Sequence, residues 1–411
     1  MTATTQSRQA PARGASRSRV RYGVFALWLV IAVLGAVGIG ERIVLGDRLG
    51  FDGSYIPWGM WVAAYIFFIG LSAGAFLLSS MVYVFGFRQF EQIGPLALFT
   101  AAVTLAMALI SILFDLGHME RFWEVFVRPQ FHSMMAWMVW LYTSYFLLLL
   151  GELFFALRRR VVPLNPDQVR GDDRRLRILG TIGVPLAIAF HGGVGALFGT
   201  VVAREYWNTA IFPVIFLSGA LLSGSALLTA IVVFLWPRRD DAWRALVGTL
   251  ARIVLVLMLL ELVLEFAEFT IPAWYQVGPE AGTIMYVLFG PFWYVFWVVY
   301  GLLGVVVPLV LLTRRGPIAR GVGAALVAVT FFAVRLNLVI PGLIAPELRG
   351  LEHAYFDPVQ NRLTYGYLPS VFEWQVTLGV VALGIALFYL GYRFLPLLEG
   401  DPERRDEEVA Q

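Results

Sequence analysis

Ten long apolar runs limit what this chain can fold into. Each is close to or above the ~20 residues that an α-helix needs to cross the ~30 Å hydrocarbon layer of a membrane. Only 14% of the residues are charged and 59% are hydrophobic, whereas soluble domains carry about a quarter charged residues. The runs do not alternate as the strands of a transmembrane β-barrel do. We therefore predict an all-α polytopic membrane protein with about ten transmembrane helices, at residues 22–40, 57–86, 94–114, 133–155, 178–202, 209–236, 249–271, 284–313, 321–344 and 371–395.

The arginines between the runs predict the orientation of the chain. Every basic residue is an arginine, and short loops that are rich in arginine stay on the cytoplasmic side. With the N-terminus in the cytoplasm, 22 arginines fall in cytoplasmic segments and 7 in outside loops, while Arg252 and Arg335 lie within runs. We expect both termini in the cytoplasm, and the longest outside segments at 41–56, 115–132 and 345–370.

The same runs predict how the chain is divided. Residues 1–21 are expected to form a disordered, arginine-rich cytoplasmic tail, and residues 397–411 a charged cytoplasmic tail. Between them lies a transmembrane domain at 22–396, in a bacterial or archaeal cytoplasmic membrane. This domain is predicted to contain a first helix at 22–40, one four-helix bundle at 57–202, a second at 209–344, and a last helix at 371–395.

Most ionisable residues within the runs fall at one depth, in the outer half of the membrane. Charged groups in hydrocarbon cost at least a few kcal/mol each, and they normally face a protein interior or a wet cavity. Glu261, Glu265 and Glu268 follow i, i+4, i+7 spacing and share one helix face. Arg335 is the obvious partner for one of these carboxylates. The other residues of this outer layer are Tyr65, Asp115, His118, His132, His191, Asn337 and Glu373, while Glu152 lies in the inner part.

Two interpretations of these groups stay open. One Arg–Glu pair could serve only to fix the packing of two helices. Three carboxylates and one arginine do not neutralise one another, however, and the spare carboxylates suit proton exchange. His191 fits a satisfied core histidine as well as a functional one, and the glycines at 192, 193 and 195 allow another helix or a flat ligand to approach it closely.

Composition excludes several kinds of site. The chain has no cysteine, which excludes an iron–sulfur cluster ligated by this chain. A bis-histidine haem needs two histidines at membrane depth, and of the four histidines only His191 lies there, so we expect no haem. Apart from Asp115 and His118, no set of His, Asp and Glu has metal-ligand spacing, so we expect no metal. The net charge of +3 follows from arginines placed by topology, and we expect no nucleic-acid partner.

Four segments resemble the NrfD/PsrC family of integral membrane subunits. They read PWGMWVAAYIFFIGLSAGAFLLSS at 57–80, FDLGHMERFWEVFVRPQFHSMMAWMVWLYTSY at 114–145, REYWNTAIFPVIFLSGALLSG at 204–224 and RLNLVIPGL at 335–343. The most specific part is Asp-Leu-Gly-His followed by Arg-Phe-Trp in the second segment. The ten predicted helices resemble the HybB-like and DsrP/HmcC-like branch more than the eight-helix branch.

This resemblance implies a quinone-reactive subunit without a redox cofactor of its own, which binds menaquinone or ubiquinone as substrate. Members of the family sit beneath a ferredoxin-like iron–sulfur protein on the extracytoplasmic face. A further catalytic subunit is a molybdopterin reductase, a nickel–iron hydrogenase or a multihaem cytochrome. By resemblance, Asp115, His118 and Arg121 match the loop motif, Tyr65 lies where the second helix lines the quinone pocket, and Arg335 matches an Arg-x-Asn segment.

The sequence therefore predicts a subunit that exchanges electrons between a membrane quinone and an iron–sulfur partner docked on the loops 115–132 and 345–370. We expect His118 and Tyr65 to hydrogen-bond the quinone oxygens, and Asp115 and Glu265 to exchange its protons. The full set of expected roles is catalysis for Asp115, His118, Glu265 and Glu268, quinone binding for Tyr65, His118, Trp123, His191 and Arg335, and an inward proton route for Glu152 and Glu261.

Two alternatives belong beside this hypothesis. A secondary transporter or proton channel without redox activity would also bury carboxylates. Against it, no run is clearly broken in mid-membrane by a Gly/Pro pair, and the polar groups cluster at one level. A combined function would let Glu152 and Glu261 carry protons inward from the quinone site, which would make the complex electrogenic.

Overall fold

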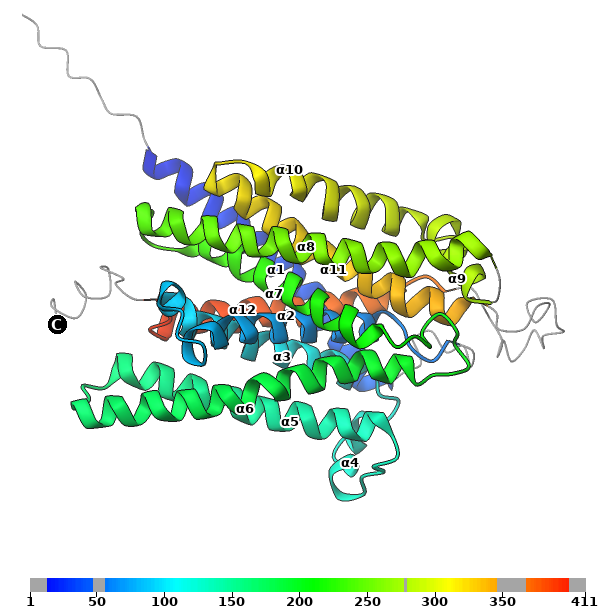
Figure 1. The fold of residues 1–411 in the computed structure, drawn as a ribbon, viewed down its shortest axis with the longest axis horizontal. Coiled ribbons are helices and arrows are strands. Elements are labelled where there is room, and N and C mark those ends of the chain that lie inside the picture. The colour runs from blue at the N-terminus through cyan, green and yellow to red at the C-terminus, as the bar shows by residue number, and fades with distance from the viewer. Residues whose placement is uncertain (1–12, 47–55, 277–278, 346–366, 399–411) are drawn as a thin grey trace, which may run out of the picture.

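The computed structural model describes residues 13–46, 56–276, 279–345 and 367–398. In these residues all regular secondary structure is helical, and turns and loops join the helices (Figure 1). Ten of its helices are long and apolar enough to cross a membrane, which confirms the predicted fold class. The elements are α1 (Arg13–Leu45), α2 (Met60–Tyr83), η2 (Arg88–Ile93), α3 (Gly94–Asp115), η3 (Met119–Arg121), α4 (Glu124–Val127), α5 (Met134–Val161), α6 (Pro166–Gly199), α7 (Phe212–Leu235), α8 (Asp241–Tyr275), α9 (Pro279–Phe289), η4 (Val295–Val306), α10 (Val307–Thr313), α11 (Pro317–Ile344) and α12 (Val371–Phe394).

Helices α2 and α7 form the centre of the molecule. Helix α2 contacts α3, α6, α7 and α11, and α7 contacts α6, α8 and α11. The two helices meet at small residues, because a Cβ added to Gly74 would overlap the Ala220 carbonyl and a Cβ added to Gly224 would lie 2.6 Å from the Gly74 carbonyl carbon. Glycine at such a crossing lets two helix backbones come together. The contacts between α2 and α7 therefore join the helices before residue 200 to those after it.

The remaining helices pack around this centre in two groups and one pair. Helices α2, α3, α5 and α6 contact one another, as do α7, α8, α10 and α11 with η4. Helix α1 pairs with α12, where a Cβ added to Gly35 would overlap the Gly379 backbone. Arg42 ties α1 to the end of α3, since its Nε and Nη2 donate to the Phe114 and Leu116 carbonyls at 2.8 and 2.7 Å. The division into domains at 57–202 and 209–344 stays a prediction.

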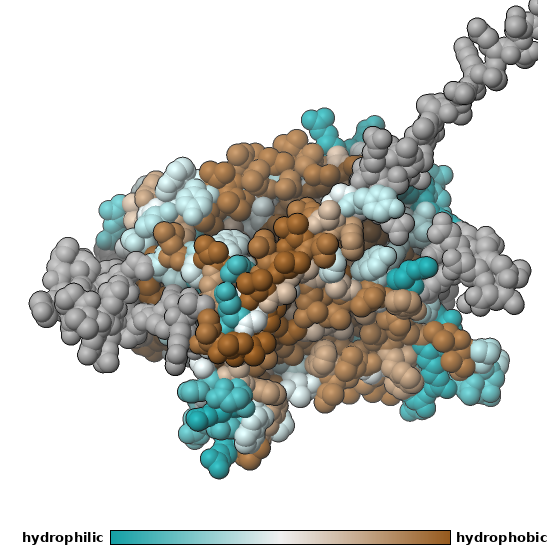
Figure 2. Space-filling model, turned by 180° about the vertical axis from the view of Figure 1, so that it is seen from behind, coloured by the Kyte–Doolittle hydropathy of each residue, from teal (hydrophilic) through white to brown (hydrophobic). Residues whose placement is uncertain are grey.

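The surface carries the pattern of a membrane protein. Figure 2 shows apolar side chains over the middle of one face, with hydrophilic groups gathered mostly towards its two ends. Many large apolar side chains on α1, α5 and α8 are exposed in this chain. Apolar surface of this extent is stable only against lipid or another protein. The chain is a multi-pass integral membrane protein.

Two elements differ from the expected boundaries. Helix α1 begins at Arg13, inside the segment expected to be a disordered tail. The run predicted as one span at 284–313 is two elements: α9 ends at Phe289, a turn at Gly290 follows, and η4 then continues into α10. Hydrogen bonds in η4 follow the π-helical pattern, which is rare and commonly marks functional sites. The break precedes the apolar span Val295–Thr313, so it is not a break in mid-membrane.

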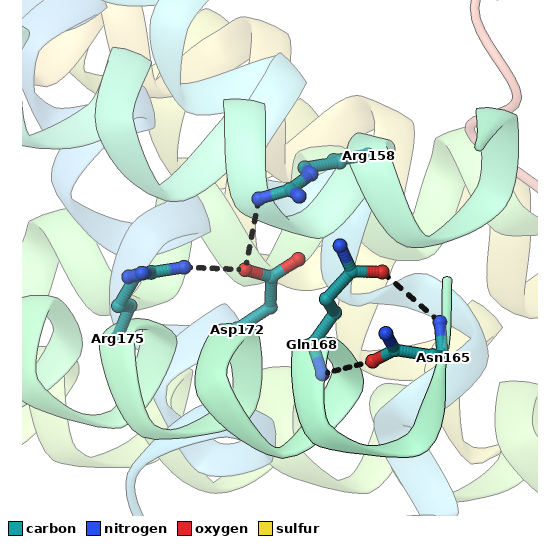
Figure 3. A network of polar contacts seen from close by, with 5 residues as sticks. All are labelled: Arg158, Asn165, Gln168, Asp172 and Arg175. Carbon is teal, nitrogen blue, oxygen red and sulfur yellow. Dashed lines mark hydrogen bonds and ion pairs between the residues drawn. The ribbon is translucent and has the colours of Figure 1, made fainter. Parts of the chain in front are cut away.

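The α5–α6 turn closes one end of the helices with an ionic network (Figure 3). Asn165 caps α6 through reciprocal hydrogen bonds with Gln168. The carboxylate of Asp172, which is fully buried, accepts from Arg158 at 3.3 Å and Arg175 at 2.9 Å. A buried carboxylate held by two arginines is costly to break. This network fixes α5 against α6 at the end opposite to α4 and α9 (Figure 1).

Candidate functional site

An open cleft of about 920 Å³ lies at the end of the helices where α2 and α5 begin and α6 and α11 end. We call this end of the molecule the cleft end. The α8–α9 connection and α4 lie at the same end (Figure 1). The cleft is lined by apolar, aromatic and a few polar side chains: Pro57, Trp58, His132, Ser133, Met134, Met135, Leu197, Thr200, Val201, Arg204, Trp207 and Leu343.

One wall of the cleft is a rigid aromatic surface. Trp58 stacks on Trp207 with ring centroids 5.7 Å apart, and Phe198 meets Trp207 edge to face at 4.9 Å. The Trp207 indole donates to the Leu338 carbonyl at 2.9 Å, which fixes its orientation. Arg204 donates to the Leu343 carbonyl at 3.1 Å and places a cation at the mouth. Such a wall suits a flat, largely apolar ligand.

A pair of buried tyrosines lies below the cleft. Tyr65 on α2 and Tyr142 on α5 share a hydrogen bond between their hydroxyl groups, and their rings meet edge to face. At the 1.5 Å rise of an α-helix, Tyr65 is ~7.5 Å along α2 from its first residue, Met60, and Tyr142 is ~12 Å along α5 from Met134. Sequence analysis expected Tyr65 at a site and missed Tyr142. The signal for Tyr142 was its spacing with Tyr145, Leu149 and Glu152, which all lie on the buried face of α5.

His191 on α6 is the third polar side chain at this depth. It is fully buried, and neither ring nitrogen makes a hydrogen bond of normal geometry within the described residues, although the Phe216 backbone lies nearby. A Cβ added to Gly70 would lie 3.7 Å from the His191 Cε1 atom, so the glycine leaves room beside the imidazole. Buried polar side chains normally have a partner. His191 is therefore a candidate to bind a ligand or water.

A second polar cluster lies between α7, α8 and α11. Arg335 is 1% exposed, and its guanidinium carbon lies 4.5 Å from the Phe216 ring centre and 4.9 Å from that of Phe331. Glu261, also buried, accepts a hydrogen bond from the Ser218 hydroxyl. Arg335 and Glu261 interact electrostatically, yet no ion pair within 4 Å joins them in the part of the chain that is described.

The carboxylates of α8 continue from this cluster towards the cleft end. Glu265 accepts a hydrogen bond from the Tyr300 hydroxyl of η4. Glu268 interacts electrostatically with Glu280 at the start of α9. Partial burial and the negative charge of Glu205 raise the pKa of Glu280, which lies outside the long spans. The sequence prediction that the three α8 carboxylates share one stripe facing other helices agrees with these contacts.

The family model described as "Polysulphide reductase, NrfD" matches residues 49–347. This chain belongs to the NrfD family. The matched range contains the cleft, the tyrosine pair, His191 and the α8 carboxylates. Among the described residues, no group of three or more His, Cys, Asp or Glu side chains is placed to hold a metal ion.

Relatives of this NrfD-family chain match it over nearly its full length. A selenate reductase subunit from Mesobacillus selenatarsenatis is 35% identical, over 92% of this chain and 95% of the relative. The Hdr-like menaquinol oxidoreductase integral membrane subunit of Archaeoglobus fulgidus is 28% identical, over 94% and 96%. The menaquinone reductase integral membrane subunit of Nitratidesulfovibrio vulgaris is 24% identical, over 92% and 93%.

The NrfD-like loop residues lie apart from the buried polar groups. The His118 side chain is 70% exposed and lies 3.0 Å from Glu120, and Trp123 is 51% exposed. Both belong to the hairpin that carries α4 and projects from the molecule on the side opposite to α8 (Figure 1). The expected pairing of Asp115 and His118 with the α8 carboxylates across the two bundles is therefore not seen. Asp115 instead interacts electrostatically with Tyr367.

The last expected site residue, Glu152, lies near the other end of α5. It is 1% exposed, and its Oε1 has no hydrogen-bond partner among the described residues. Its surroundings are Tyr83 of α2, Tyr145 of α5 and Gly180 of α6. The structure thus separates the expected site residues into five places: the tyrosine pair with His191, the α7–α8–α11 cluster, the exposed hairpin, Asp115 beside Tyr367, and Glu152.

Proposed function

We propose that this chain is the quinone-reactive membrane subunit of a respiratory oxidoreductase complex, and that the quinone head group binds at the cleft. One observation supports this most directly: an aromatic-walled cleft lies over the Tyr65–Tyr142 pair and the buried imidazole of His191, whose ring nitrogens have no hydrogen bond of normal geometry among the described residues. Two relatives are named for menaquinol or menaquinone chemistry. A quinol supplies two electrons and two protons when it is oxidised.

The cleft residues fit such a ring. The stacked pair of Trp58 and Trp207 offers a flat apolar face for the ring. The two oxygens of the quinone ring accept hydrogen bonds in the oxidised form, and in the reduced quinol their hydroxyl groups donate them. A hydroxyl serves as both donor and acceptor, and a neutral imidazole has one nitrogen of each kind. Tyr65, Tyr142 and His191 can therefore hold either form, and His191 is the group placed to take up or return a proton.

Electrons would pass to an iron–sulfur protein docked at the cleft end. We propose that the exposed hairpin with His118 and Trp123, which follows Asp115 at the end of α3, belongs to the docking surface and not to the quinone pocket. The other expected docking loop, 345–370, falls largely outside the described residues. The arginine distribution makes the cleft end extracytoplasmic in this proposal. A molybdopterin reductase, a nickel–iron hydrogenase or a multihaem cytochrome would complete the complex.

Quenching of tryptophan fluorescence by a short-chain menaquinone analogue tests this assignment on the purified chain. Tyr65→Phe should raise the Kd about tenfold, because loss of one hydrogen bond of ~1.4 kcal/mol has that effect. His191→Leu should act in the same direction. Trp274→Phe is the matched control, since Trp274 lies near the same end and is 85% exposed. A photoreactive quinone that labels α8 and α11 but not α2, α5 or α6 would contradict the location.

The same measurement separates the transporter alternative from the redox proposal. A transporter or proton channel without redox activity would show no saturable binding of the analogue. It would still move protons or solute in vesicles that contain this chain alone. Saturable binding that competes with quinol, together with an inert chain in such vesicles, supports the quinone-reactive subunit.

A further inference from the structure

We propose that the α8 carboxylates form a proton half-channel, which connects a buried pocket at Arg335 and Glu261 with the surface at the cleft end. The proposal rests on the proposed function in one respect only: a quinol is taken as the source of the protons. The chain's own part is to hold a proton at Glu261 and to exchange it with the surface through Glu265 and Glu268.

The first argument is the order of the carboxylates along α8. At 1.5 Å per residue, Glu265 lies ~6 Å and Glu268 ~10 Å along the helix from Glu261, on the same face. Glu261 is fully buried, whereas Glu265 and Glu268 are partly exposed. Beyond them, Glu280 interacts electrostatically with both Glu268 and the exposed Glu205. The series therefore runs from the interior to the surface.

The second argument is a set of buried polar atoms that lack partners at the inner end. Within the described residues, no hydrogen bond reaches Nε or Nη2 of Arg335 or Oε1 of Glu261. Arg335 is 1% exposed and Glu261 0%. Buried groups of this kind are usually satisfied by ordered water. A pocket that holds water beside a carboxylate is what proton transfer needs.

Gly219 leaves room for the Arg335 and Glu261 side chains to lie against the backbone of α7. A Cβ added there would lie 2.8 Å from both Arg335 Nη2 and Glu261 Oε1, and 2.6 Å from the Phe331 ring. A helix-fixing ion pair would close the gap between the two charged groups, but their side chains stay out of ion-pair range. The geometry therefore favours proton exchange over the purely structural pair that the sequence left open.

The charges around the three α8 carboxylates also indicate that at least one of them holds a proton. The titratable or charged groups that face them from neighbouring elements are His191 and Arg335 at the inner end, Tyr300 beside Glu265, and Tyr206, Glu205 and Glu280 at the outer end. Arg335 is the only cation among them in the described chain, against three α8 carboxylates. At least one carboxyl must then be protonated to avoid buried net negative charge.

Each transfer breaks one O–H bond and forms another, so it needs no further reactant. Two protons leave each quinol that is oxidised, while the two electrons go to the iron–sulfur partner. A proton on Glu261 passes through bound water to Glu265 and Glu268, and from there to Glu280 and the solvent. Protons would therefore leave at the end of the molecule where the cleft opens.

Dicyclohexylcarbodiimide, which reacts with protonated carboxyl groups in apolar surroundings, tests this on the purified chain. We expect labelling of Glu261 or Glu265, located by mass spectrometry, that decreases as the pH rises and is unchanged by sodium. Glu373 is the internal control, because it is equally buried but fully engaged by Tyr367, Ser370 and the Met60 amide. No label on α8, or protection by sodium, would overturn the proton route.

The intact complex in vesicles gives the second test. Glu265→Gln should lower quinol-linked proton release at least about tenfold, leave the Kd of the menaquinone analogue within about twofold, and be partly rescued by Glu265→Asp. Gly219→Ala should also slow release, because its methyl group displaces the Arg335 and Glu261 side chains while every charge is kept. Normal release in both Glu265→Gln and Gly219→Ala would overturn the half-channel and leave the proposed function intact. Labelling of α8 in a chain that binds no quinone would overturn the proposed function and leave the half-channel intact.

Discussion

The Arg335 guanidinium carbon lies 4.5 Å from the centre of the Phe216 ring, and the His191 ring lies 6.2 Å from the same ring. A single aromatic side chain thus separates His191 from the polar cluster between α7, α8 and α11. Arg335 and His191 also interact electrostatically. The charge of one group therefore changes the electrostatic potential at the other, although no hydrogen bond joins them among the described residues.

Replacing Arg335 should affect function more than stability. Removal of one partner of a buried ion pair costs ~3–5 kcal/mol when a charge is left uncompensated. The carboxyls around Arg335 can instead take up a proton and become neutral, which avoids that cost. We expect Arg335→Met to keep or raise the thermal unfolding temperature in detergent, while quinol-linked turnover of the complex falls at least about tenfold. A clear loss of thermal stability with normal turnover would show that Arg335 only fixes the helices.

The glycine crossing of α2 and α7 should not accept larger side chains. Gly74→Val would place branched carbons against the Ala220 carbonyl, and overpacking of this kind typically costs ~1–3 kcal/mol or more. We expect a lower unfolding temperature and a lower yield of monodisperse protein in size-exclusion chromatography. Gly282→Ala is the control, because no other atom lies within 4 Å of a Cβ added there. Equal behaviour of the two variants would contradict the crossing.

Arg42 should hold α1 in place. Its Nε and Nη2 donate to the Phe114 and Leu116 carbonyls, and a hydrogen bond that involves a charged group contributes ~1.5–3 kcal/mol. Arg42→Ala should increase hydrogen exchange at the α3 C-terminus and along α1, with little change in α7. Arg252→Ala serves as the comparison, since Arg252 is exposed and its hydrogen bonds among the described residues stay within α8. Unchanged exchange in α1 would mean that the Gly35–Gly379 contact with α12 suffices.

The start of α9 should become less stable as the pH rises. Burial and Glu205 raise the pKa of Glu280 from its ordinary value of 4.5. A carboxyl whose pKa is higher when folded binds its proton more tightly in that state, so local stability decreases as the pH rises from about 4.5 through the raised value. Hydrogen exchange in α9 should therefore accelerate with pH beyond the intrinsic chemical rate. Glu280→Gln should remove this additional acceleration of exchange. If the acceleration persists in the variant, a group other than Glu280 causes it.

Hydropathy and residue spacing predicted much of this fold. The ten apolar runs became ten candidate spans because length and composition decide what can cross hydrocarbon. The i, i+4, i+7 spacing correctly placed Glu261, Glu265 and Glu268 on one face of α8, since a continuous helix fixes that relation. The loop motif at 114–145 and the other quoted segments also identified the NrfD family, which the match to 49–347 confirms.

Contacts between helices could not be predicted in the same way. Equal depth in the membrane says nothing about the angle around the bundle, so Asp115 and His118 were expected opposite the α8 carboxylates. Asp115 instead interacts with Tyr367, and His118 is exposed beside Glu120. Tyr142 was missed because its spacing with Tyr145, Leu149 and Glu152 indicates a buried helix face but not which of these residues meets Tyr65. The π-helical pattern of η4 depends on its packing against α11 and was equally invisible.

That π-helix has a consequence for how this gene can vary. A π-helix accommodates more residues per turn than an α-helix, and removal of one residue before Tyr300 would turn the following side chains by ~100°. Tyr300 would then no longer face Glu265. Single-residue deletions between 295 and 299 should therefore be selected against, even where each individual side chain could be exchanged. The length of this segment is then conserved independently of its sequence.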